Sequence, residues 1–223
     1  MKNELIIVND PKSLFSEAIR TLRTNLQFSL VANNANVLMI TSSVPGDGKS
    51  FISSNLSAAF SMMNIKVLIV DCDMRKGRLH KIFEVSNEKG LSNLLLDEVK
   101  NYKKYVQKTK VDNVSVIPLG IVPPNPSELL NSDKFENLID TLRDAYDLVI
   151  LDTPPIGSVS DSLVIAKYVD EAIIVTSYKQ TPMEDLNETK KALEATGVKI
   201  AGIVLNNMEY KKHSKYYYNK YYN

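Results

Sequence analysis

The chain has 223 residues and a formal net charge of +1 at pH 7, so it can form one α/β domain with a large core and carries no overall nucleic-acid signal. Its single cysteine, Cys72, excludes a disulfide framework and favours a reducing compartment such as the cytosol. We expect neither a signal peptide nor a membrane span, because no stretch approaches about 20 apolar residues.

The first predicted element is an amphipathic helix over residues 14–30, where apolar residues recur every four positions. Glu17, Arg20 and Arg23 follow one another at spacings of three on an adjoining face of this helix. Judged by spacing alone, these charges form a solvated surface that is supported by glutamate–arginine pairing.

Residues 37–63 predict a strand, a tight phosphate-binding loop and a helix. The loop matches the Walker A pattern, except that Ser43 stands where that pattern has glycine. Backbone N–H groups and a helix N-terminus bind phosphate in such loops. We therefore expect the nucleotide-binding residues to be Pro45, Gly46, Asp47, Gly48, Lys49, Ser50 and Phe51. Lys49 would reach the outer phosphates, and the Ser50 hydroxyl would ligate Mg²⁺.

Two further buried strands end in acidic residues. The strand over residues 67–70 runs into Asp71 and Asp73, and the strand over residues 148–151 runs into Asp152. Ligands of an open parallel sheet bind beyond the carboxyl ends of its strands, so these acids should lie beside the phosphate loop. There they suit Mg²⁺ coordination through water and acceptance of a hydroxyl proton. The simpler alternative is a set of acidic turns that only leave the strands.

Strand alternation makes a finer prediction for the segment after residue 70. It places Asp71, Asp73 and Arg75 on one side and directs Cys72 into the core.

The rest of the chain alternates strands with helices. We expect a short helix in residues 90–96, a lysine-rich surface segment in 102–110, an extended proline-rich loop in 123–126, a helix in 128–145 broken near 131–133, and strands in 114–118, 172–176 and 200–205. Thr181 and Glu184 form a predicted capping box for a helix that runs to Thr196, with Gly197 as its C-cap. This alternation predicts a mostly parallel sheet flanked by helices on both faces.

The C-terminal segment differs from the body. Residues 210–223 carry a charge of +4 without acids, which leaves −3 on the remainder, and they hold six tyrosines: Tyr210, Tyr216, Tyr217, Tyr218, Tyr221 and Tyr222. We therefore expect a domain over residues 1–208 and a mobile tail over 209–223. Taken alone, the tail could equally bind RNA or anionic lipid. Phosphorylation of all six tyrosines would change the charge of residues 210–223 from +4 to about −8.

Six patterns occur in a particular order: Glu17-x-x-Arg20-x-x-Arg23, Pro45 to Ser50, Asp71 to Arg75, Pro123 to Leu130, Leu151 to Pro155, and the tyrosine cluster. In this order they resemble the bacterial tyrosine kinases of capsule and exopolysaccharide synthesis. The similarity is to the separate cytosolic kinase subunit, which works with a membrane-embedded activator.

The resemblance implies a P-loop fold related to the partitioning ATPases, with ATP and Mg²⁺ as cofactors. Lys49, Asp71, Asp73 and Asp152 would be catalytic, and Ser50, Asp73 and Asp152 would hold the metal. Asp71 is the candidate proton acceptor, although spacing would allow Asp71 and Asp73 to exchange roles.

The resemblance also implies an assembly. Glu17, Arg20 and Arg23 would form the interface of a ring-like homo-oligomer, which replaces the simpler reading of a solvated face. Neighbouring subunits would phosphorylate one another's six tail tyrosines. Such a kinase would be cytoplasmic and held at the inner face of the membrane through its activator. Its other substrates would be proteins that it phosphorylates on tyrosine, and no nucleic-acid partner is expected.

Two alternative functions remain. One is a partitioning-type ATPase switch without kinase activity, but Val44 stands where those ATPases carry a signature lysine, and they lack a tyrosine-rich end. The other is a nucleotide-bound scaffold without catalysis, against which the three acidic positions argue.

Overall fold

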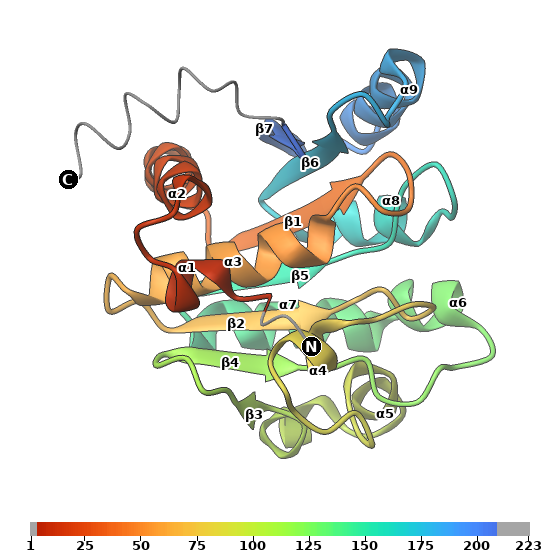
Figure 1. Cartoon of the computed structure of the whole chain (residues 1–223). Helices are drawn as coiled ribbons and strands as arrows, with labels where there is room; N and C mark the ends of the chain where they lie inside the picture. The colour runs from red at the N-terminus through yellow and green to blue at the C-terminus, as the bar shows by residue number, and fades with distance from the viewer. Residues whose placement is uncertain (1–3, 209–223) are drawn as a thin grey trace.

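Parallel strands form the centre of the molecule, as seen in the computed structural model, which describes residues 4–208 (Figure 1). The sheet has the strand order β3-β4-β2-β5-β1-β6-β7, and only β3 runs antiparallel to its neighbour. The strands are β1 (Val37–Ser42), β2 (Val67–Asp71), β3 (Gln107–Lys108), β4 (Val114–Ile117), β5 (Leu148–Asp152), β6 (Glu171–Ser177) and β7 (Lys199–Asn206). The predicted mostly parallel α/β fold is therefore confirmed.

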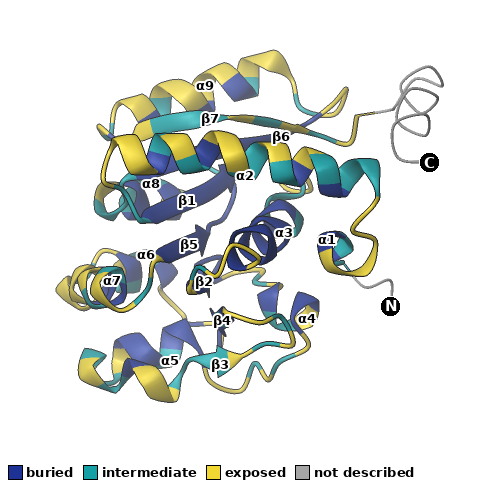
Figure 2. Cartoon of the chain, turned by 90° about the vertical axis from the view of Figure 1, so that its left-hand side faces the viewer, coloured by how far each residue is buried: buried dark blue, intermediate teal, exposed yellow. Residues whose placement is uncertain are grey.

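Helices cover both faces of this sheet (Figure 2). One face carries α1 (Ile6–Asn9), α2 (Leu14–Ala32), α3 (Lys49–Ser61) and α4 (Leu79–Ile82). The other carries α5 (Leu91–Leu96), α6 (Pro126–Leu130), α7 (Asp133–Ala145), α8 (Asp161–Ile165) and α9 (Met183–Glu194), with short 3-10 helices at Val99–Lys104 and Ala166–Tyr168.

The central strands read as continuous apolar runs because both of their faces are buried. In β1, Val37 and Met39 enter the core beneath α5–α9, whereas Leu38 and Ile40 enter the core beneath α1–α4. All four of these side chains are fully buried. Alternate residues of one strand thus anchor both helical layers.

The prediction that the lysine-rich segment 102–110 lies on the surface is partly wrong. Tyr102 is 8% exposed and joins the core beneath α5–α9, and residues 107–108 form the edge strand β3. The neighbouring lysines hide this contact in the sequence, and two residues are too few to show strand periodicity.

Several helix boundaries also differ from the predictions. Helix α3 begins at Lys49 rather than residue 51, and α6 begins at Pro126 rather than residue 128. The break between α6 and α7 lies where it was predicted. Helix α9 ends at Glu194, and Gly197 follows in a left-handed turn with φ of 83°.

The predicted capping box of α9 does not form. Pro182 precedes the first helical residue, and no side chain caps this helix. The Thr181 hydroxyl instead accepts a hydrogen bond from the Ser177 N–H and donates to Asp47 in the phosphate loop. The Thr181 hydroxyl, which the local sequence predicted to cap α9, is therefore used in a tertiary contact with the phosphate loop.

None of the helices within residues 4–208 is long and apolar enough to cross a membrane. The predicted mobile tail over residues 209–223, with its six tyrosines, lies outside the described residues.

Candidate active site

The phosphate loop is shaped by two glycines and braced from the far edge of the sheet. Gly46 and Gly48 both have φ of 92°, which L side chains rarely adopt. The Asn206 amide at the end of β7 donates to the Asp47 carbonyl at 2.9 Å. A Cβ atom on Gly48 would lie 2.2 Å from the nitrogen of that amide, so this position has room only for glycine.

The Asp47 side chain, predicted to bind nucleotide, is used within the protein. Its carboxylate is 1% exposed and accepts hydrogen bonds from the Val44 and Ser177 N–H groups, at 3.2 Å each, and from the Thr181 hydroxyl. It therefore ties the loop to β6, and only its backbone is left to meet a phosphate.

The predicted acids and Lys49 come together at the carboxyl edge of the sheet. Strands β2 and β5 are neighbours, and their register sets Asp71 directly opposite Asp152. The Lys49 ammonium lies 3.1 Å from the Asp73 carboxylate. Residues from three separate segments thus meet at one point, as expected for a site at the end of parallel strands.

A turn, rather than strand alternation, sets the direction of Asp73. Strand β2 ends at Asp71, and one Asp73 oxygen accepts the N–H groups of Arg75 and Lys76 at 3.3 and 2.9 Å. Arg75 lines the same cavity as Asp73, and its side chain forms an ion pair with Asp161 that the sequence did not predict. Cys72 is buried in the core, as predicted.

Burial controls the charges of this cluster. Asp71 and Asp152 are fully buried, and desolvation raises the pKa of both carboxyl groups. The pKa of Asp71 rises well above its ordinary value, because the charge of Asp152 adds to the effect of burial. Burial opposes the charge of Lys49, but the negative charges of Asp152 and Asp73 prevail and raise its pKa. Lys49 therefore stays cationic.

The donor set fits Mg²⁺. Both carboxylate oxygens of Asp152 and one of Asp71 are buried, and the nearby Ser50 and Ser53 side chains limit the rise in the pKa of Asp152. Anionic oxygens of this kind are the ligands that Mg²⁺ prefers, and one or two suffice when phosphates and water complete the shell. Within residues 4–208, no three acidic, histidine or cysteine side chains form a ready-made metal cage. Ser50 and Asp152 would hold such a metal together with a bound phosphate.

A cavity of about 380 Å³ opens above these residues. It is lined by Pro45, Gly46, Gly48, Lys49, Ser50 and Phe51 of the loop region, by Asp73, Arg75, Lys76 and Arg78 after β2, and by Pro154, Pro155, Ser158 and Val159 after β5. Six of the seven predicted nucleotide-binding residues line it, and only Asp47 does not. Lys76 and Arg78 bring positive charge that no motif had indicated.

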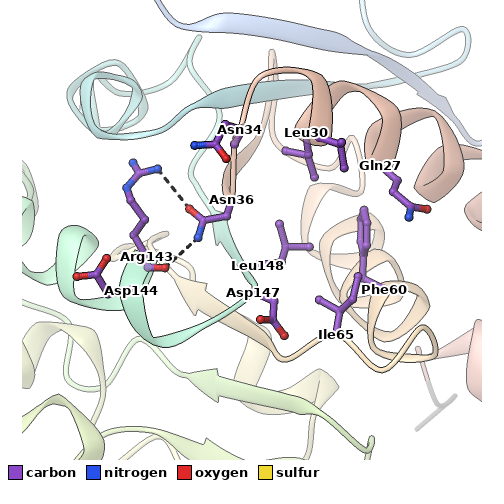
Figure 3. A pocket seen from close by; sticks show the side chains of 12 residues that line it. Gln27, Leu30, Asn34, Asn36, Phe60, Ile65, Arg143, Asp144, Asp147 and Leu148 are labelled. Carbon is purple, nitrogen blue, oxygen red and sulfur yellow. Dashed lines mark hydrogen bonds between the residues drawn. The ribbon is translucent and has the colours of Figure 1, made fainter.

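A second cavity of about 500 Å³ lies at the opposite end of the strands (Figure 3). Arg143 and Asn36 exchange two hydrogen bonds at its rim, and its apolar wall includes Leu30, Phe60 and Leu148. None of the predicted site residues lines this cavity, so it is separate from the cluster of acids.

The three charged residues predicted as an oligomer interface make contacts within the subunit. Glu17 and Arg20 form an ion pair, and Arg20 also donates to the Pro11 carbonyl at 2.5 Å. Arg23 donates to the Ala59 carbonyl of α3 at 3.1 Å. Their role between subunits stays a prediction.

These features define a class of protein: a P-loop domain that binds nucleotide phosphates at the carboxyl edge of a parallel sheet. The family model described as an AAA domain matches residues 35–200. Tyrosine-protein kinase YwqD of Bacillus subtilis is 38% identical over 98% of this chain and 92% of its own length. The chain therefore belongs to the bacterial tyrosine kinase family that its motifs predicted.

Solved structures agree. The kinase domain of Escherichia coli tyrosine kinase ETK superposes with a TM-score of 0.89 and 38% identity, covering 93% of this chain and 81% of that domain. The sequence of Escherichia coli tyrosine-protein kinase etk is much longer, and the chain spans 29% of it. The septum site-determining protein MinD of Pyrococcus horikoshii, solved with Mg-ADP, has a TM-score of 0.65 and 25% identity, covering 79% of this chain and 72% of MinD.

Replacing Asp71 by Asn should change the pH dependence of stability. A carboxyl group whose pKa is raised by folding stabilises the protein below its ordinary pKa, and that contribution is lost as the pH rises through the raised value. Asp71→Asn should therefore raise the unfolding midpoint near pH 8 by at least about 2–4 °C, the shift that matches roughly 1 kcal/mol in a domain of this size. The gain should shrink as the pH falls. Thermal unfolding in EDTA without nucleotide, repeated across the pH range, measures the gain in midpoint and its dependence on pH. Asp140→Asn, at an exposed position, is the control. A midpoint difference between Asp71→Asn and wild type that is the same at every pH would contradict this account.

Gly77 has no room for a side chain, because an added Cβ would lie 2.7–2.8 Å from the Asp71 carboxylate. We expect Gly77→Ala to destabilise the fold by about 1–3 kcal/mol through overpacking. Urea denaturation gives the free energy of unfolding. Gly202→Ala, where an added Cβ meets nothing within 4 Å, is the matched control and should not destabilise. Equal stabilities for the two variants would show that the Asp71 carboxylate can move freely.

Proposed function

We propose that this chain is an ATP-dependent kinase that phosphorylates its own C-terminal tyrosines in trans and thereby regulates capsule or exopolysaccharide synthesis. The observation that carries the proposal is the meeting of Lys49 with Asp71, Asp73 and Asp152 beside the phosphate loop. The names of the relatives as tyrosine-protein kinases support the choice of tyrosine as acceptor. The acceptor residues themselves, Tyr210, Tyr216, Tyr217, Tyr218, Tyr221 and Tyr222, are proposed from the sequence.

Transfer in this site depends on position and charge. The loop would hold the phosphates of ATP, and Lys49 would turn from Asp73 toward the outermost phosphate, where its cationic state suits the charge that develops during transfer. When bound, Mg²⁺ supplies positive charge on the phosphate oxygens, and Ser50, Asp73 and Asp152 would hold it. The tyrosine oxygen forms a bond to the γ-phosphorus as the bond to ADP breaks.

The tyrosine proton passes to a carboxylate in the same step. Asp71 is the proposed acceptor because burial and the charge of Asp152 raise its pKa, and a base acts best when its pKa lies near the working pH. Asp73 is the rival, because it lines the cavity whereas Asp71 does not.

The proposed assembly follows the relatives. The chain corresponds to 29% of the longer etk chain, and a membrane-embedded activator is the proposed partner of the separate unit. Under this proposal the protein is cytoplasmic and peripheral at the inner face of the membrane. Glu17, Arg20 and Arg23 would exchange their contacts within the subunit for contacts in a ring-like homo-oligomer, and other tyrosine proteins would serve as substrates.

A partitioning-type ATPase switch is the second candidate, and the likeness to MinD favours it. It requires ATP turnover without phosphotyrosine. Val44 at the position of the signature lysine and the tyrosine-rich end make it the weaker proposal.

Intact-mass spectrometry after incubation with Mg²⁺ and ATP tests the kinase. The wild type should gain several phosphates, and Lys49→Met should lose activity by about 10²–10³-fold, because it removes a charged donor to the reacting phosphate. Lys190→Met, on the surface of α9, is the control and should behave as wild type.

A mixture resolves the trans step. A chain truncated after residue 208 has no tail, so it should phosphorylate added full-length Lys49→Met protein. If full-length wild type gains phosphate in its own incubation and Lys49→Met gains none in this mixture, transfer between subunits is excluded. ATP consumption without any mass gain, with the activator's cytosolic segment present, would favour the ATPase switch.

The proton acceptor is identified by pH–rate profiles. Asp71→Asn should lower kcat by about 10²–10⁴-fold and flatten the acid limb of the profile, while nucleotide binding stays near wild type. Asp73→Asn, measured alongside, should weaken the Mg²⁺ dependence instead. If Asp73→Asn flattens the acid limb and Asp71→Asn does not, the two roles are exchanged.

A further inference from the structure

Asp161, the first residue of α8, is a fully buried carboxylate that belongs to none of the sequence motifs. The Arg75 guanidinium contacts both of its oxygens, at 3.1 and 3.4 Å. The Ser127 hydroxyl donates to it at 2.5 Å. Asp161 therefore joins three segments that are far apart in the sequence: the turn after β2, the start of α6 and the start of α8.

The turn held by Asp161 is the one that orients Asp73. The N–H groups of Arg75 and Lys76 both donate to one Asp73 oxygen, and the other oxygen faces Lys49 at 3.1 Å. A continuous chain of contacts thus runs from Asp161 through the Arg75 side chain and backbone to Asp73 and Lys49. A displacement of Arg75 would move two of the three groups that contact the Asp73 carboxylate.

The same ion pair joins two walls of the cavity. Arg75 and Lys76 line it from the turn after β2, and Ser158 and Val159 line it from the loop that leads to Asp161. The Arg75 side chain is 43% exposed, whereas Asp161 is completely buried. A buried carboxylate that loses its partner is strongly unfavourable, so Arg75 is held firmly at this place.

We infer that Asp161 is a positioning residue, which holds Asp73 for Mg²⁺ binding through Arg75 and is itself held by Ser127. The inference rests on the proposed role of Asp73 as a metal-binding group. It gives the proline-rich motif from Pro123 to Leu130 a function, because this motif delivers Ser127 to Asp161. Groups that orient a metal ligand from outside its coordination shell change metal affinity or activity by about 10–100-fold when they are mutated.

Calorimetric titration with ADP, once with Mg²⁺ and once with EDTA, tests the inference without relying on catalysis. Asp161→Asn keeps an oxygen for Ser127 but loses the charge that holds Arg75. It should weaken Mg²⁺-dependent ADP binding by about tenfold and leave binding in EDTA within about twofold. Arg75 also lines the cavity, so each variant is compared with its own ADP binding in EDTA. Arg75→Ala should lower the Mg²⁺-dependent gain in affinity by the same factor as Asp161→Asn, and the double variant should lower it no further, because both remove the same contact. Arg75→Lys and Ser127→Ala should fall between these variants and wild type.

Arg143→Ala is the matched control. Arg143 also forms an ion pair between elements, with Asp170 at 2.6 Å, but it lies at the opposite end of the strands (Figure 3). It should lower thermal stability and leave both titrations unchanged. Should Asp161→Asn fail to fold, Arg75→Lys and Ser127→Ala carry the test, since both keep the buried carboxylate and a fold-stabilising partner.

Three results would overturn the inference: equal losses with Mg²⁺ and with EDTA, additive effects of Asp161→Asn and Arg75→Ala, or the same change in Arg143→Ala. Asp73→Asn separates this failure from failure of the proposed function. If Asp73→Asn abolishes the Mg²⁺ dependence and Asp161→Asn does not alter it, the role of Asp73 stands and that of Asp161 falls. If Asp73→Asn has no effect on the Mg²⁺ dependence, the proposed metal site is itself wrong.

Discussion

Two carboxylates buried side by side are the constraint on which this site depends. The register between β2 and β5 sets Asp71 opposite Asp152, and both side chains are removed from water. Like charges in such a place raise each other's energy, and the surroundings compensate only in part. The positive charge of Lys49 acts on both carboxylates, so charge attraction holds the phosphate loop to the acids. The same arrangement leaves carboxylate oxygens available for a metal and raises the pKa of both carboxyl groups.

The groups around this cluster hold it in place. Asp47 and Asn206 fix the loop to β6 and β7, and Asp161 fixes the turn that carries Asp73. Gly77 leaves space for the Asp71 carboxylate. Polar groups that are fixed before substrate arrives cost little to reorganise during the reaction, which is the physical advantage of building a phosphate-transfer site on rigid strand ends.

Helix α2 packs directly on the helix that begins at the phosphate loop. Arg23 donates to the Ala59 carbonyl near the end of α3, and the rings of Phe15 and Phe51 lie 4.8 Å apart at its start. Phe51 also lines the cavity. Helix α2, which carries the proposed oligomer interface, is thereby in contact with both ends of α3.

The sequence by itself determined the fold class, the order of the main strands and helices, and the positions of Lys49, Asp71 and Asp152. These follow from local patterns: long apolar runs make buried strands, and the acids and the loop come directly after them. Only the tertiary structure decided that Asp47 and Thr181 serve each other, that Tyr102 is buried and that Arg75 turns to Asp161. Each of these contacts joins residues distant in the chain, or depends on a turn whose geometry no periodicity encodes. A short-range pattern predicts which groups reach the edge of the sheet, but the partner that each group finds there depends on packing between segments.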